Sequence, residues 1–130
     1  MVVRLAWLIV LLHVVISTVH GIAHMRLGIT LNAFQSAYVL LVITLAPILA
    51  AVLLLVRRIR PGFILLALSM AGSLVFGIYW HYLAESPDNV AHLHEGTLPA
   101  LFRATALLLV VSEVGGVVIG LWGSLKDQKL

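Results

Sequence analysis

The chain has 130 residues, of which 62% are hydrophobic and 10% charged, and its mean hydropathy is +1.15. A chain of this length cannot hide so much apolar surface from water in its own core, so the composition excludes an ordinary water-soluble domain and predicts a membrane protein. The net charge of +3 comes from basic residues in short loops and near the ends, which argues against a nucleic-acid partner. Cysteine is absent, which excludes thiolate metal sites and disulfides.

Four stretches are apolar and long enough to cross a bilayer, at about residues 3–25, 33–56, 62–84 and 98–124. A hydrocarbon layer of roughly 30 Å needs about 20 residues of helix. Backbone groups must be paired within lipid, and the stretches lack the alternation of a barrel strand, so helices are favoured. The sequence therefore predicts an all-α integral membrane four-helix bundle, formed by residues 1–130 as a single four-span domain in the lipid bilayer.

The first span carries a polar stripe. His13, Ser17, His20 and His24 fall within about 60° of one another on a helix, so this face should point into the bundle. Arg4, the apolar run after it and the small residues near Ala23 also resemble a secretory signal peptide. The length of the run and the histidine inside it favour a span that is retained.

The second span contains Pro47, which has no N–H to offer the Ile43 carbonyl. A kink is expected here, with the Thr44 hydroxyl placed to cap the freed carbonyl.

The fourth span contains Glu113 near its middle, at a depth similar to that of His13 in the first span. Charged groups are costly at this depth, so the two side chains are expected to form an intramembrane polar pair. The pair is either a structural hydrogen bond or part of a proton relay. The Gly116-x-x-x-Gly120 spacing is typical of close helix packing, although the small residues of the last two spans could also make room for a haem: Ala71, Gly72, Ser73, Gly77, Gly115, Gly116 and Gly120.

Basic residues set the expected orientation. Arg4, the turn at residues 57–60, and Lys126 with Lys129 should face the cytoplasm, which places both termini there. Aromatic residues near the ends of the spans, such as Trp7 and Trp80, fit interfacial belts. We expect a multi-pass protein of a bacterial inner membrane, with the acidic loop at residues 85–95 outside, where Arg103 could pair with its carboxylates.

Five of the six histidines gather near the outer face. His20 and His24 have the i,i+4 spacing with which one helix offers two ligands to one metal, and His81 at the end of the third span can supply a third. Nitrogen and oxygen donors suit copper, zinc or iron. Haem b is the alternative, held by His81 with His20 or His24. The outer loop adds the candidate ligands His92 and His94, and the further candidates Glu85, Asp88 and Glu95.

Three functional hypotheses remain open. The first is a small polytopic membrane protein with a histidine-rich metal or haem site at the extracytoplasmic face, which acts in metal handling or electron transfer, either alone or as a subunit of a larger complex. The second is a cofactor-free accessory or scaffold protein, whose small-residue faces pack on a membrane-protein partner or a second copy. The third is a proton-coupled carrier that uses His13 and Glu113. The sequence contains no catalytic motif, so it leaves enzymatic activity undecided.

Overall fold

The computed structural model describes residues 1–126, and every regular element in that range is a helix. The second and third spans are each built from more than one helical segment. The elements in chain order are α1 (Val2–Arg26), α2 (Ala33–Tyr38), the π-helical segment η1 (Val39–Leu45), α3 (Ala46–Leu55), α4 (Ile59–Ile78), the π-helical turn η2 (Tyr79–Leu83), the 3-10 turn η3 (Val90–His92) and α5 (Thr97–Leu125).

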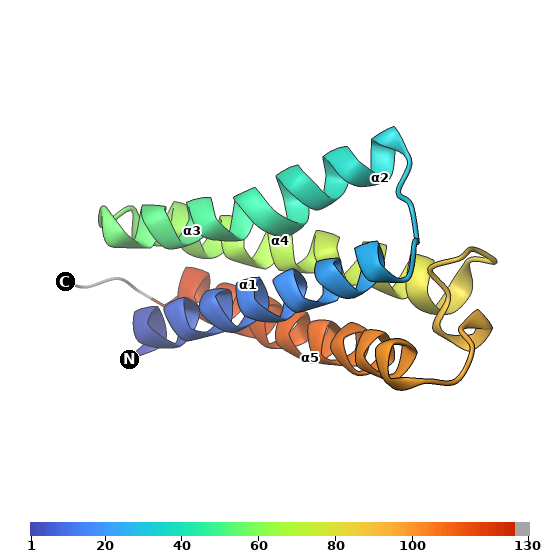
Figure 1. Ribbon diagram of the computed structural model, residues 1–130. Coiled ribbons are helices and arrows are strands. Elements are labelled where there is room, and N and C mark those ends of the chain that lie inside the picture. Colours follow the sequence, from blue (N-terminus) through green and yellow to red (C-terminus); the bar gives the residue numbers. More distant parts are fainter. Residues whose placement is uncertain (127–130) are drawn as a thin grey trace.

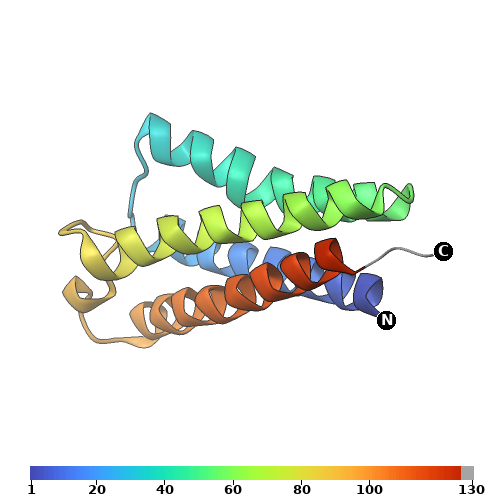
Figure 2. The same ribbon diagram turned by 180° about the vertical axis from the view of Figure 1, so that it is seen from behind.

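The predicted four-helix bundle is confirmed (Figures 1 and 2). Its four spans are long and apolar enough to cross a membrane, and each boundary lies within three residues of the predicted one. Large apolar side chains such as Leu8, Leu68 and Val118 are exposed on the outside of the bundle, as contact with lipid requires. The spans are Val2–Arg26, Ala33–Leu55, Ile59–Leu83 and Thr97–Leu125.

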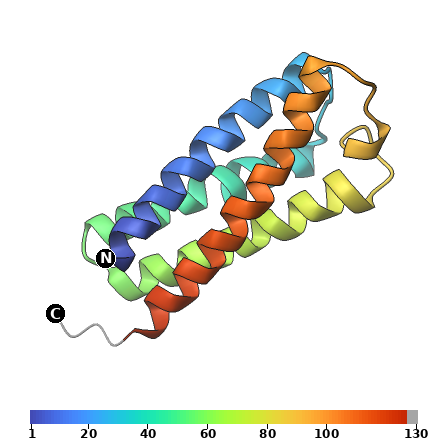
Figure 3. The same cartoon turned by 90° about the horizontal axis from the view of Figure 1, so that it is seen from below.

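The bundle has two different ends (Figure 3). The N-terminus, the turn between α3 and α4 and the end of α5 lie at one end, which we call the terminal end. The connector 27–32 and the loop 84–96 lie at the other, which we call the loop end. Lys129, which contributed to the expected orientation, lies outside the described residues.

Glycines let α5 approach α4 closely. A Cβ placed on Gly120 would lie 2.6 Å from the Ala67 backbone nitrogen, and one on Gly116 would lie 2.5 Å from Met70 Cγ. Contacts this short are incompatible with any larger side chain unless the helices move apart. Gly116 and Gly120 therefore serve helix packing within the chain, as their spacing predicts.

The apolar core lies toward the terminal end. It is built from the first part of α1, from α3 and from the first part of α4, and α5 covers it. At the loop end, buried polar side chains such as His20, His81 and Asp88 lie beside buried apolar ones such as Phe102. The core residues are Ala6, Val10, Ala50, Leu54, Phe63, Leu66 and Met70.

The second span is π-helical just before Pro47, and the Ile43 carbonyl has a partner other than the expected one. His13 Nε2 on α1 lies 3.1 Å from Ile43 O, so the imidazole supplies the donor that proline lacks. The Thr44 hydroxyl donates to Val39 O instead. The prediction that Thr44 caps Ile43 is therefore wrong, because the Thr44 hydroxyl bonds a carbonyl five residues earlier in η1 while His13 occupies Ile43 O.

Candidate metal centre

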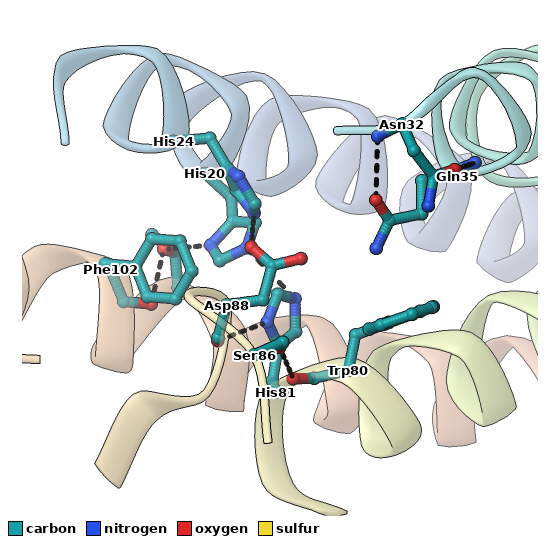
Figure 4. Close-up of polar contacts among 10 residues, drawn as sticks. His20, His24, Asn32, Gln35, Trp80, His81, Ser86, Asp88 and Phe102 are labelled. Atoms are coloured by element: carbon teal, nitrogen blue, oxygen red, sulfur yellow. Dashed lines mark hydrogen bonds and ion pairs between the residues drawn. The ribbon is translucent and has the colours of Figure 1, made fainter. Parts of the chain in front are cut away.

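Three histidines from two helical spans converge at the loop end (Figure 4). His20 and His24 project from the last two turns of α1, and His81 projects from η2. One ring nitrogen from each lies within 4.8 Å of the other two. His20 and His81 are buried, and the side chain of His24 is 12% exposed.

The two Nε2 atoms of His20 and His81 are 3.2 Å apart. Two nitrogens bound to one tetrahedral metal ion at about 2.0 Å are separated by roughly 3.3 Å. This edge of the cluster therefore already has the spacing of a metal site.

The other ring nitrogen of His81 is fixed by the backbone. Its Nδ1 lies 3.1 Å from the carbonyl oxygen of Asp88, and a carbonyl can only accept a hydrogen bond. Nδ1 therefore carries the proton, and in the neutral ring Nε2 presents a lone pair to His20.

The Nδ1 side of the His20 ring is bonded to α5. Its Nδ1 lies 2.8 Å from Thr105 Oγ1, and the same hydroxyl lies 2.8 Å from Leu101 O and 3.0 Å from Phe102 O. The hydroxyl has one proton, and when it gives that proton to a carbonyl of its own helix it accepts from His20 Nδ1. In that arrangement Nε2 of His20 presents a second lone pair toward His81. In the other tautomer, Thr105 donates to Nδ1 and the Nε2–H of His20 donates to His81 Nε2 across the same 3.2 Å.

His24 completes the cluster beside an acidic residue. Its Nε2 lies 3.3 Å from Asp88 Oδ1, and its Nδ1 is buried without a hydrogen-bond partner among residues 1–126. Burial raises the pKa of the Asp88 carboxyl above its ordinary value, although the nearby His81 lowers it. Each of the three rings thus keeps one nitrogen free of hydrogen bonds to carbonyl or hydroxyl groups.

Phe102 on α5 packs against the cluster and is fully buried. Its ring centroid lies 4.4 Å from that of His20, 4.9 Å from that of His24 and 5.4 Å from that of His81. An aromatic ring in contact with all three imidazoles restricts their rotation. The sequence analysis assigned neither Phe102 nor Thr105 to the site.

The outer loop is held in place by α5. Arg103 donates from Nε to Val90 O at 3.0 Å and from Nη2 to Leu93 O, so it binds loop carbonyls and not the carboxylates that the sequence suggested. Asn89 donates to Ala84 O at 2.8 Å. These bonds fix the loop that carries Asp88, and only 3% of Asp88 is exposed.

The remaining loop candidates lie elsewhere. His92, His94, Glu85 and Glu95 are all exposed and do not belong to the group of converging ligand atoms. Among the further ligands considered from the sequence, the structure brings Asp88 alone beside the cluster within residues 1–126.

The structure does not join the expected polar pair of His13 and Glu113. His13 is fully buried and its Nε2 contacts Ile43 O. The Oε2 atom of Glu113 is buried and makes no hydrogen bond to any residue that the structure describes. Glu113 instead lines a cavity that also contains the three-histidine cluster.

Comparison of the chain with known protein families, with curated proteins and with solved structures gives no match. The class of protein is therefore defined by the fold and the three-histidine cluster alone. This is a helical four-span protein with three histidines at metal-binding distance.

Proposed function

We propose that the protein is a membrane metalloprotein in which His20, His24 and His81 bind one transition metal ion. The observation that carries the proposal is the convergence of three ring nitrogens within 4.8 Å of one another, with the Nε2 atoms of His20 and His81 3.2 Å apart. Without a metal ion, one of these two rings donates its Nε2–H to the other. When the His20 proton is on Nδ1, a metal ion accepts a lone pair from each Nε2 and both rings stay neutral, which suits a membrane span.

The outer hydrogen bonds support the same proposal. Histidines that bind metals commonly donate their second N–H to a carbonyl, carboxylate or hydroxyl group, which fixes the ring and raises its basicity. His81 has such an acceptor in Asp88 O, and His20 has one in Thr105 Oγ1. Three nitrogen donors suit zinc, copper or iron and leave a fourth position for water, for the Asp88 carboxylate or for a substrate.

Haem b fits this geometry less well. A haem iron bound by His20 and His81 would hold their nitrogens on opposite faces of the porphyrin, about 4 Å apart at metal–nitrogen distances near 2.0 Å. The two rings here are T-shaped, with centroids 4.9 Å apart, so the helices would have to separate to admit the macrocycle. The role that follows is metal handling, or electron transfer if the ion is copper or iron.

Two other hypotheses from the sequence receive less support. A scaffold that binds a partner through its glycine faces conflicts with the use of Gly116 and Gly120 inside the bundle. A carrier that passes protons between His13 and Glu113 lacks the expected contact, because His13 is bonded to Ile43 O.

The test is metal binding by the purified full chain in detergent. The protein is stripped with a chelator, loaded separately with Zn²⁺, Cu²⁺ and Fe²⁺, and analysed for bound metal. We expect close to one equivalent of at least one ion, and a His20→Ala/His81→Ala variant that binds at least about 100-fold more weakly. The His92→Ala/His94→Ala variant is the matched control, since it removes two exposed histidines, and it should bind like the wild type. Less than a tenth of an equivalent of every ion, or equal binding by the two variants, would contradict the proposal.

A further inference from the structure

A cavity of about 560 Å³ lies between all four spans in the loop half of the bundle. Its wall is mainly apolar and includes Ile43, Phe76 and Leu109, and the His20–His81 pair lies against it. This volume is within the range of sites that bind small organic molecules, roughly 300–1,000 Å³.

Glu113 gives this apolar cavity a polar anchor. Only 2% of the residue is exposed, and its Oε2 has no hydrogen-bond partner within the described range 1–126. Gly77 leaves the space beside it open, because a Cβ placed there would still be 3.9 Å from Glu113 Oε2. Leaving a buried polar atom unpaired is costly, so a molecule that supplies the missing hydrogen bond binds more tightly than one of the same shape that does not.

The cavity reaches the surface between the first two spans. α2 leans away from α1 toward the loop end (Figure 1), and α1 packs on α5 and α3 instead. Met25, Gly28, Thr30 and Ser36 line the cavity and are exposed. The opening therefore lies beside the connector 27–32, where an amphiphilic molecule at the membrane surface can enter between α1 and α2.

From this geometry we propose that the cavity binds a lipophilic alcohol or phenol, with its apolar body against the Phe76 and Leu109 wall and its hydroxyl group on Glu113. A lipid acyl chain would fill the apolar part but leave Oε2 unpaired. A hydroxyl group both donates and accepts, so it pairs with this carboxyl group in either protonation state. The proposal goes beyond the metal centre and does not depend on it, because it rests on the cavity and on Glu113.

The experiment uses two photoreactive probes on the full chain in lipid nanodiscs. One is a dodecanol that carries a diazirine on its chain, and the other is the matching diazirine dodecane without the hydroxyl group. We expect the alcohol to label the cavity wall, read by mass spectrometry at Phe76 and Leu109, about fivefold or more above the alkane, as a gain of 1 kcal/mol or more implies.

Substitutions of Glu113 and of Gly77 test the polar anchor and the space beside it separately. Glu113→Leu should lower labelling by the alcohol to the level of the alkane, whereas Glu113→Gln, which keeps hydrogen-bonding atoms, should retain most of it. Gly77→Leu keeps Glu113 and fills the space beside it, so it should also abolish labelling. Val75→Phe adds volume to the exposed face of the same helix, and it should label like the wild type.

The outcomes separate this proposal from the metal proposal. A Glu113→Leu chain that loses labelling but still binds one equivalent of metal supports the cavity site and demonstrates that the variant is folded. If Glu113→Leu does not fold, the comparison of Gly77→Leu with Val75→Phe tests the proposal instead. Equal labelling by alcohol and alkane, or unchanged labelling in Gly77→Leu, would overturn the proposal and leave the cavity to water or acyl chains.

Discussion

At the scale of single residues, the side chain that sets the chemistry of the cluster is Thr105. Its hydroxyl lies 2.8 Å from His20 Nδ1 and 2.8 Å from Leu101 O. When it donates to Leu101 O it accepts from Nδ1, and the proton of His20 is then on the nitrogen that points away from His81. If the proton moved to Nε2, the lone pair needed for a metal would be lost, so Thr105 is a positioning residue for the proposed centre.

Thr105→Val should therefore weaken metal binding by about 10–100-fold, the usual effect of losing an outer hydrogen bond to a ligand. Valine has nearly the same shape, so packing against Phe102 is kept. Thr105→Ser retains the hydroxyl and is the control, with binding close to the wild type. Affinity is measured by competition with a chromogenic zinc chelator. If Thr105→Val binds as tightly as Thr105→Ser, the hydroxyl does not select the tautomer.

Much of the cluster could be predicted from the sequence, because helical periodicity fixes the relation between residues on one span. The i,i+4 spacing placed His20 and His24 together, and the parallel direction of the first and third spans brought His81 to the same end. Loop residues follow no such period. The hydrogen bonds of Asn89 and Arg103 decide that Asp88 turns inward while His92 stays exposed, and no sequence pattern encodes that choice.

At the scale of helical elements, the contact between α1 and η1 pairs two polar groups that each lack a partner within their own helix. Pro47 leaves the Ile43 carbonyl without its helical donor, and His13 on another helix supplies one. The sequence indicated that His13 needs a partner and that Ile43 O needs a donor. It could not match them, because the π-helical register of the second span is set by packing and not by periodicity.

This pairing predicts a coupling that a double-mutant cycle can measure. His13→Leu removes the donor and should destabilise the protein by about 1–2 kcal/mol, since Ile43 O is left unpaired inside the bundle. In a Pro47→Ala background the new backbone N–H can serve that carbonyl, so the same substitution should cost less. A coupling of about 0.5–1.5 kcal/mol in unfolding by a denaturing detergent is expected. Strictly additive effects would mean that His13 stabilises the bundle by some other contact.

At the scale of the whole molecule, the two ends of the bundle differ in the residues that fill them. The terminal end holds the apolar core and the closest glycine contacts, which fix the helices against one another. The loop end holds the histidine cluster and the cavity. Because the helices are packed closely at the terminal end, the ligating side chains at the loop end can be held in position while space remains there between the spans for a ligand.

The orientation of these ends in the membrane is the last prediction. Three arginines in the turn at the terminal end favour the cytoplasm for that end, which places the proposed metal centre at the opposite face. Because the chain has no cysteine, a single cysteine introduced at an exposed position reports its own location. We expect Glu95→Cys to react with a membrane-impermeant maleimide in intact cells, and Arg58→Cys to react only after the cells are opened. Both positions are exposed in the folded protein, so neither result depends on unfolding. Reaction of both from the same side would contradict the four-span arrangement, whereas the reverse pattern would keep the bundle and place the metal centre at the cytoplasmic face.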